Sequence, residues 1–219
     1  MRKQKVLVVF LCGLVLLTGM WRNEKVQEAS AQAEKAGTIA LTFDDGPHCT
    51  YTKELLDGLR ERGVKATFFL IGKNIEGNED LVRQMSEDGH LIGCHTYSHV
   101  DLTKCTLSEA LCEVEMTDDL ITGITGKVVE YVRPPFGNWK DSLAEALPLT
   151  VVRWTVDPED WKDQNREHVV AKVKKNVKDG SIILLHDNYR TSVEAALDIV
   201  DDLQKEGYEF VTMDELLLD

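Results

Sequence analysis

Two short clusters of potential metal ligands and proton-transfer groups stand out in the sequence. Asp44 and Asp45 are adjacent and close an apolar stretch, and His95 and His99 lie four positions apart further along the chain. One carboxylate and two imidazoles form a facial ligand set that leaves coordination positions open for water and substrate. The second carboxylate would then lie beside that water, where a general base is needed. The combination predicts a hydrolytic metal site.

Each cluster also has a simpler interpretation when it is taken alone. Asp, Gly and Pro form turns readily, so the segment from Asp44 to Pro47 could be an ordinary turn. Isolated histidines are usually surface or core residues, and we interpret His48, His90 and His168 in that way. A phosphatase with an aspartate nucleophile is disfavoured because the two aspartates are adjacent rather than separated by one residue.

The N-terminus carries the features of an export signal. Residues 1–5 are basic and residues 6–17 are almost wholly apolar, as in the n- and h-regions of a secretory signal. Residues 1–33 are therefore predicted to be a signal peptide, with an uncleaved membrane anchor as the alternative, so the protein is secreted or associated with the cell envelope. The remaining residues 37–219 suit one well-buried domain, which we expect to be monomeric.

The net charge limits the classes of partner that the protein can bind, and the cysteines determine which disulfides it could form. The net charge of -13 argues against nucleic acid or anionic lipid, because no basic patch is available to neutralise phosphates. Contact with a membrane is therefore expected only through the possible anchor. Beyond the signal, Cys49, Cys94, Cys105 and Cys112 could form two disulfides or remain free thiols.

Apolar runs alternate with amphipathic segments along residues 37–219. The predicted strands are residues 39–43, 66–71, 90–94, 129–132, 151–156, 181–185 and 210–213. Capping-box patterns at Thr106-x-x-Glu109 and Thr191-x-x-Glu194 predict the starts of two of the helices, and Gly207 suits a C-terminal cap. Such alternation predicts a parallel sheet with right-handed crossovers, as an open sheet or a barrel.

Polar residues follow the predicted strands at their C-terminal ends, which favours a barrel. They are Asp44 with Asp45, His95, Arg133, Asp157 and His186. An α/β barrel collects catalytic groups from many strand ends at one face. The predicted fold class is therefore α/β, a distorted (β/α) barrel in a single domain.

Five segments resemble, in order and spacing, the signature of the NodB-type polysaccharide deacetylases (carbohydrate esterase family 4). They are Thr42-Phe-Asp-Asp-Gly-Pro47, His95-Thr-Tyr-Ser-His99, Arg133-Pro-Pro-Phe-Gly137, Asp157-x-x-Asp-Trp161 and Leu184-Leu-His-Asp187. The resemblance covers residues 38–217 and implies that residues 37–219 are a polysaccharide deacetylase catalytic domain.

The resemblance also implies roles for individual residues. Asp45, His95 and His99 would hold a divalent cation, first of all Zn²⁺, with Co²⁺, Ni²⁺ or Mn²⁺ as alternatives. Asp44 would be the general base, and Arg133 would hold and tune it.

Other residues would complete the site by the same resemblance. His186 would be the general acid, and Asp160 would raise its pKa. The backbone N–H of Phe136 would help to stabilise the oxyanion, and Trp161 and Leu184 would shape a pocket for the acetyl methyl group. The role of Asp157 stays open.

Two positions depart from the family pattern. Phe136 stands where tyrosine is frequent, which is harmless if only its backbone acts. Cys94 stands where an amide that could orient His95 is common, so metal affinity could be altered. A Cys49–Cys94 disulfide is a further hypothesis.

The resemblance predicts a metal-dependent hydrolase that removes N-acetyl groups from N-acetylglucosamine residues of a glycan polymer. Export makes peptidoglycan the first substrate. Alternatives are deacetylation of chitooligosaccharide or exopolysaccharide, and O-deacetylation of acetylxylan. A catalytically inactive glycan-binding protein is the alternative from a different class, which the intact set of acidic and histidine residues disfavours.

Overall fold

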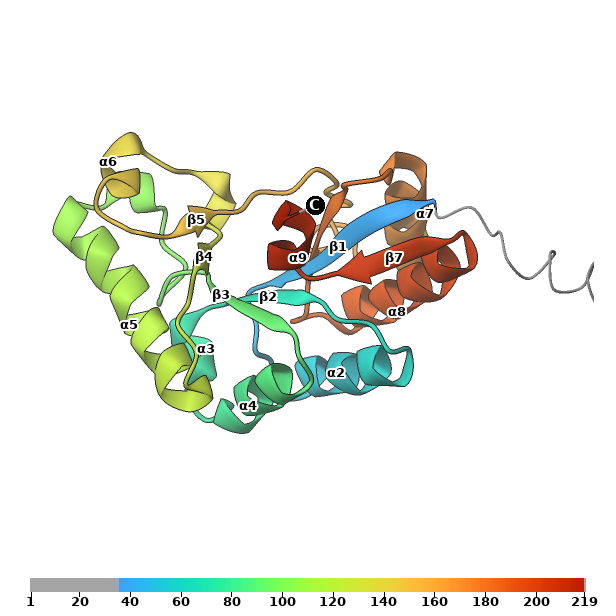
Figure 1. Cartoon of the computed structure of the whole chain (residues 1–219), viewed down its shortest axis with the longest axis horizontal. Helices are drawn as coiled ribbons and strands as arrows, with labels where there is room; N and C mark the ends of the chain where they lie inside the picture. Colours follow the sequence, from blue (N-terminus) through green and yellow to red (C-terminus); the bar gives the residue numbers. More distant parts are fainter. Residues whose placement is uncertain (1–35, 219) are drawn as a thin grey trace, which may run out of the picture. The chain divides into compact units, whose positions relative to one another are not determined.

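The computed structural model describes residues 36–218, so the predicted signal peptide or anchor at residues 1–33 lies outside the described residues. The described part contains seven strands that form one parallel sheet (Figure 1). They are β1 (Gly37–Asp44), β2 (Thr67–Leu70), β3 (Leu91–Cys94), β4 (Tyr131–Val132), β5 (Thr150–Val151), β6 (Ile182–His186) and β7 (Tyr208–Val211). Among the helices of residues 36–218, none combines the length and the hydropathy that a membrane span requires.

The strand order is β5-β4-β3-β2-β1-β6, and β1 lies near the centre because it also pairs with β7. Its N-terminal half pairs with β7, and its C-terminal half pairs with β2 and β6. The register places Asp44 beside Phe69 of β2 and His186 of β6. Because all strands run in the same direction, their C-terminal ends meet at one edge, as predicted.

All helices but the last lie between successive strands and cover the outside of the curled sheet, whereas the helix after β7 packs against β1 (Figure 1). The helices are α2 (Tyr51–Glu61), α3 (Gly72–Ile75), α4 (Glu79–Glu87), α5 (Leu107–Thr125), α6 (Asp141–Ala144), α7 (Arg166–Asn176), α8 (Arg190–Lys205) and α9 (Met213–Leu218). Neighbouring contacts run in the order α5, α4, α2, α8, α7. The leucines of α2 show why these helices form here, since Leu55, Leu56 and Leu59 share one face and are fully buried.

The predicted barrel is confirmed in distorted form, because the sheet curls but closes only partly. The apolar run 151–156 was expected to be one strand, yet β5 ends at Val151. The chain leaves the sheet at Arg153, whose carbonyl accepts a hydrogen bond from Arg133 Nη2 at 3.4 Å. It returns at Val156, which forms an isolated bridge with Ile183 of β6. At Arg153, a hydrogen bond from the buried Arg133 side chain thus replaces the strand pairing that was expected.

The two predicted helix starts have different outcomes. The capping box at Thr106 is confirmed, because its hydroxyl accepts from the N–H of Glu109 and the Glu109 carboxylate accepts in return. The box predicted at Thr191 is wrong, since the N-cap of α8 is Tyr189, two residues earlier, and it makes no side-chain cap bond. Gly207 follows α8 with φ of 90°, in the left-handed conformation expected at such a helix end.

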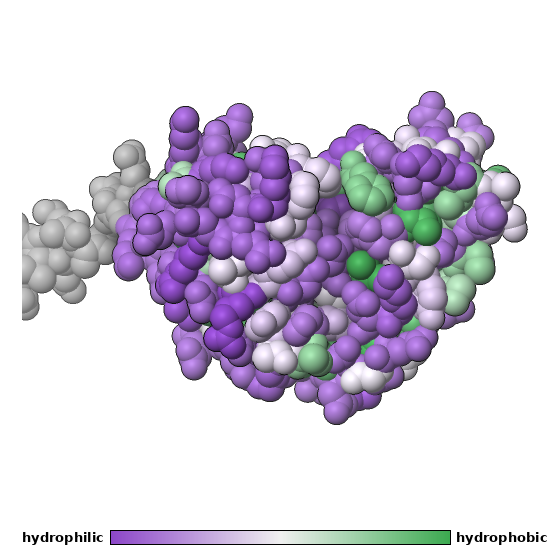
Figure 2. Space-filling view, turned by 180° about the vertical axis from the view of Figure 1, so that it is seen from behind, coloured by the Kyte–Doolittle hydropathy of each residue, from purple (hydrophilic) through white to green (hydrophobic). Residues whose placement is uncertain are grey.

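The hydrophilic character of the surface agrees with the high net charge of the chain. The face in Figure 2 is largely hydrophilic, with hydrophobic residues in small separate groups. Two of the exposed large hydrophobic residues of the described part are Phe136 and Trp161, at 64% and 50% exposure. Both lie in segments that the sequence associates with the site, so their exposure points to a ligand rather than to the core.

Gly93 of β3 provides a test of how tightly the sheet is packed beneath the site. A Cβ at this position would lie 2.7 Å from the Phe69 ring and 2.9 Å from the carbonyl oxygen of Tyr131. We expect Gly93→Ala to lower the free energy of unfolding by about 1–3 kcal/mol, because the Phe69 ring must move. Urea unfolding measures this change.

Gly123→Ala is the matched control for that substitution. Gly123 lies in α5, and no atom lies within 4 Å of the place that its Cβ would occupy. The same added methyl group should raise stability there by about 0.5–1 kcal/mol, because alanine favours the helix. Equal stability of Gly93→Ala and the wild-type protein would contradict the tight packing around Gly93.

Candidate metal centre and active site

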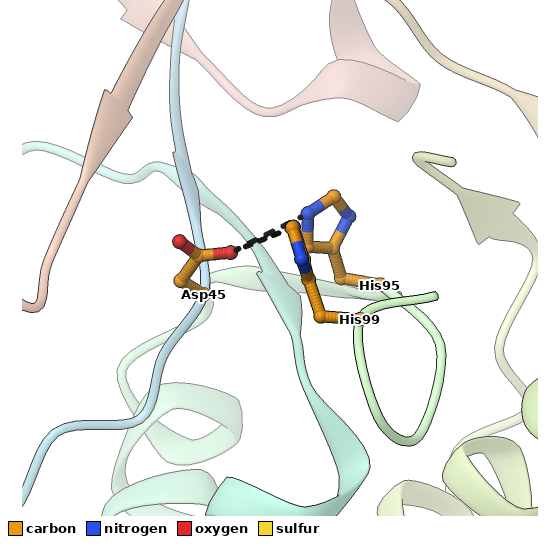
Figure 3. A group of neighbouring side chains, drawn as sticks. All are labelled: Asp45, His95 and His99. Atoms are coloured by element: carbon orange, nitrogen blue, oxygen red, sulfur yellow. Dashed lines mark ion pairs between the residues drawn. The ribbon is translucent and has the colours of Figure 1, made fainter. Parts of the chain in front are cut away.

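Three side chains predicted as metal ligands converge at the C-terminal edge of the sheet (Figure 3). Asp45 follows β1, and His95 and His99 come from the loop after β3. The Oδ1 atom of Asp45 lies 3.5 Å from Nε2 of both histidines. The potential ligand atoms of all three residues lie within 4.8 Å of one another. The structure therefore brings together the carboxylate and the two imidazoles across about fifty residues of sequence.

The donor set fits a divalent cation. Asp45 Oδ1 is buried and has no hydrogen-bond partner, although buried carboxylate oxygens are normally satisfied. The imidazole rings of His95 and His99 lie 5.1 Å apart, tilted by 58°, rather than stacked. One carboxylate with two imidazoles suits zinc and other first-row divalent ions.

Unusual backbone conformations hold these ligands in place. Asp45 and His99 have φ of 73° and 58°, in the left-handed region that non-glycine residues seldom adopt. Asn74 of α3 donates to the carbonyl oxygen of Asp45 at 2.8 Å, and the N–H of His99 donates to Thr96 Oγ1 at 3.0 Å. Such strain persists only where surrounding contacts impose it, and it occurs often at functional sites.

The orientation of His95 comes from the backbone and not from residue 94. Nδ1 of His95 lies 2.6 Å from the carbonyl oxygen of Arg133, so Nδ1 donates and Nε2 is left with its lone pair facing Asp45. Cys94 is fully buried on the other side, where its thiol accepts from the N–H of Thr96 at 3.3 Å. His95 thus has an outer partner that does not depend on residue 94, and an effect of Cys94 on metal affinity stays a prediction.

The cysteines of the described part are free thiols. Cys94 is buried, whereas Cys49 is exposed, so the hypothesis of a Cys49–Cys94 disulfide is wrong. Burial raises the pKa of the Cys94 thiol to about 12, which keeps it protonated. Of the two possibilities left open by the sequence, the structure has the thiols.

Asp44 is paired with Arg133 in the interior. Asp44 is 3% exposed and Arg133 is 0% exposed, and Nη1 of Arg133 donates to Asp44 Oδ1 at 2.8 Å. The same nitrogen contacts Thr42 Oγ1 at 2.7 Å, and the guanidinium lies 4.2 Å from the centre of the Phe69 ring. Burial lowers the pKa of Arg133, and the Asp44 carboxylate opposes that shift. Asp44 Oδ2, the other oxygen, lies 3.7 Å from His95 Nε2 and so faces the metal ligands.

His186 is held by the fully buried Asp160. Its Nδ1 lies 2.8 Å from Asp160 Oδ1, and its backbone N–H donates to Asp160 Oδ2 at 2.9 Å. Burial alone would lower the pKa of His186, but the hydrogen bond and charge of Asp160, with the charges of Asp44 and Asp45, raise it to about 9. The imidazole is therefore cationic near neutral pH, and Nε2 carries a proton that can be transferred.

A cavity of about 340 Å³ joins these groups. Asp44, Asp45, His95, His99 and His186 line it, together with the predicted pocket residues Phe136, Trp161 and Leu184. Asp157 also lines the cavity, where its Oδ1 accepts from the N–H of Glu159.

Sequence reasoning missed three residues of this site. Trp154 and Tyr189 line the cavity, and Thr42 is the second partner of Arg133. Thr42 is the first residue of the segment Thr42–Pro47, so the sequence motif could have identified it. Trp154 sat in the run expected to be a strand, and Tyr189 gave no pattern that distinguished it from a helix N-terminus.

The effect of Asp160 on His186 can be measured in the metal-free protein. We expect Asp160→Asn to lower the pKa of His186 from about 9, because burial is then opposed only by the charges of Asp44 and Asp45. Titration of the His186 ring by NMR measures this change. Asp157→Asn is the matched control, since Asp157 lines the same cavity but does not contact His186.

The same pair predicts a pH dependence of stability. The folded-state pKa of His186, about 9, lies above the unfolded value of 6.5. Protonation of His186 among Asp160, Asp44 and Asp45 therefore stabilises the metal-free protein by up to roughly 3 kcal/mol below pH 6.5, and this contribution is lost as pH rises through 9. Asp160→Asn should cost more stability at pH 6 than at pH 9.5, and an equal cost at both values would contradict the coupling.

Comparisons with known proteins agree with this geometry. Residues 31–152 match the family described as Polysaccharide deacetylase. The chain is 41% identical over 178 residues to the peptidoglycan-N-acetylmuramic acid deacetylase PdaC of Bacillus subtilis, which covers 81% of this chain and 38% of PdaC. It is 37% identical over 215 residues to the peptidoglycan-N-acetylglucosamine deacetylase PgdA of Listeria monocytogenes, covering 98% of this chain and 46% of PgdA.

A solved structure of PdaC from Bacillus subtilis has the same fold. It superposes with a TM-score of 0.81 at 40% identity, and the match covers 83% of this chain and 90% of that one. The chain spans less than half the length of the two curated relatives named above. The fold, the Asp-His-His cluster and these matches together show that the chain belongs to the polysaccharide deacetylase family, the NodB-type enzymes of carbohydrate esterase family 4.

Proposed function

We propose that this protein is a metal-dependent hydrolase that removes acetyl groups from the amino sugars of peptidoglycan. The observation that carries the proposal is the cavity in which a candidate metal centre, Asp44 and His186 face one another. Hydrolysis of an acetamide consumes one water and yields acetate and a free amine. It needs a base at the attacking water and an acid at the departing nitrogen.

Asp45, His95 and His99 would hold the divalent cation, for which we propose Zn²⁺. Such an ion supplies Lewis-acid polarisation of the acetyl carbonyl and lowers the pKa of water. The chain itself provides two imidazole nitrogens and the unpartnered carboxylate oxygen that this role requires.

We assign the proton transfers to two residues on neighbouring strands. Asp44, whose Oδ1 accepts a hydrogen bond from Arg133, would take the proton of the attacking water through Oδ2, the oxygen that Arg133 leaves free. His186, kept protonated by Asp160, would give a proton to the leaving amine. The two residues thus have partners of opposite charge in one cavity, which suits them to the opposite roles of base and acid.

The remaining cavity residues would bind and orient the acetylated sugar. Trp161 and Leu184 supply apolar surface for the acetyl methyl group, and the Phe136 ring lies edge-on to that of His99, with the two ring centres 4.9 Å apart. Phe136 has φ of 61° inside the turn Pro135–Gly137, so its backbone direction is set by an unusual conformation. We propose that its N–H helps to stabilise the oxyanion.

The proposed substrate is the N-acetylglucosamine residue of peptidoglycan, and its site of action would be the cell envelope. PgdA is a peptidoglycan-N-acetylglucosamine deacetylase by name, and its similarity covers nearly the whole chain. The similarity to PdaC favours a second candidate, N-acetylmuramic acid, in the same polymer. N-acetylmuramic acid differs from N-acetylglucosamine by a lactyl group on the hydroxyl oxygen of the carbon next to the acetamide-bearing carbon. Identification of the sugar that loses its acetyl group therefore distinguishes the two candidates.

Acetate release tests the proposed function. Metal-loaded protein should release acetate from peptidoglycan or from an N-acetylglucosamine pentamer, and Asp45→Ala should abolish release together with metal binding. His186→Ala should lower kcat by about 10²- to 10⁴-fold with metal binding retained, because only proton transfer is lost. Mass spectrometry of digested peptidoglycan would show which of the two sugars carries the free amine.

His168→Ala is the control for these variants, since His168 is exposed and its Nδ1 contacts only Asp163 in the part of the chain described. It should leave the rate unchanged. Release from acetylxylan alone would replace the proposed amide substrate with an ester. Absence of both release and bound metal would contradict the enzyme proposal.

A further inference from the structure

The loop that carries His95 and His99 is braced by an acidic residue outside the recognised motifs. Glu113 of α5 accepts two hydrogen bonds from Ser98, the residue directly before His99. The backbone N–H of Ser98 lies 2.7 Å from Glu113 Oε2, and its hydroxyl lies 2.6 Å from Oε1. Both carboxylate oxygens are thus used on one residue of the loop.

The loop needs such support because its backbone is strained at two points. Thr96 and His99 both have positive φ, at 66° and 58°. The N–H groups of Gly72 and Lys73 at the start of α3 donate to the carbonyl oxygens of Thr96 and Tyr97, each at 3.0 Å. These bonds hold the first half of the loop, and the Glu113 bonds hold the half that leads into His99.

The negative charge of Glu113 is not paired with a cationic side chain among the described residues. It is half-buried and forms no ion pair with a described lysine or arginine, in a chain whose net charge is already -13. A carboxylate in that position gains from accepting hydrogen bonds, and a carboxylate bond to a backbone N–H is stronger than one between neutral groups.

We propose that Glu113 is a positioning residue for the metal centre, which sets the peptide before His99 and thereby the direction of its imidazole. This inference rests on the proposed metal site. Outer partners of metal ligands fix ligand orientation, and their loss typically costs about 10- to 100-fold in metal affinity. Glu113 acts one step further away, through the backbone, so the lower end of that range is expected.

Zinc affinity of three variants tests the inference. Glu113→Ala should weaken zinc binding about tenfold in competition with a chelating dye. Glu113→Gln should restore most of the affinity, because its amide oxygen can accept from the Ser98 N–H while its NH₂ donates to the Ser98 hydroxyl. Glu115→Ala is the matched control, since Glu115 is exposed on the same helix and its substitution should leave affinity unchanged.

A double-mutant cycle with Ser98→Ala separates positioning from general stability. The loss of affinity in Glu113→Ala should be smaller when Ser98 already lacks its hydroxyl, because the two substitutions remove a shared interaction. Thermal unfolding of the metal-free variants is measured in parallel. A lower Tm for Glu113→Ala with zinc affinity equal to that of the wild-type protein would show a purely structural role and overturn the inference. Absence of zinc binding by the wild-type protein would overturn the proposed function itself.

Discussion

The buried pair of Arg133 and Asp44 is the constraint on which the site depends. Two charges without access to solvent are costly unless they are paired and hydrogen-bonded, and removal of either partner leaves the other uncompensated. Nη1 of Arg133 donates to Asp44 and Thr42, while its buried Nε has no partner among the described residues. The carbonyl oxygen of Arg133 accepts a hydrogen bond from Nδ1 of His95. A single residue after β4 therefore orients the proposed base and one proposed metal ligand together.

The parallel register brings a residue of β6, the neighbouring strand of β1, to the same end of the sheet. Asp44 is aligned with His186 of β6, so the base and the proposed acid occupy equivalent positions on adjacent strands. Asp160 reaches His186 from the irregular segment that follows Val156, where the barrel closes by a single bridge. The incomplete closure of the barrel therefore contributes to the site. The irregular segment contains Asp160, whose carboxylate raises the pKa of His186.

Asp44 and His186 have partners of opposite charge in the same cavity. Asp44 faces a permanent cation, whereas His186 faces an anion that is fully buried. Neighbouring charge decides the outcome against burial in the case of His186, whose pKa rises although desolvation acts to lower it. For His90, which has no hydrogen-bonded carboxylate, desolvation prevails over the charge of Asp88 and lowers the pKa to about 4.

Most of the elements and the chemistry of the site could be predicted from the sequence. Buried strands such as residues 66–71 are recognisable by their continuous apolar residues, and the motifs identify Asp45, His95 and His99 because ligand type and spacing are local properties. Three features required the folded chain: Val151 ends β5, the Arg133 carbonyl rather than residue 94 orients His95, and Glu113 braces Ser98. Each of these depends on contacts between segments apart in the chain, and such contacts follow from packing and register, which no local pattern records.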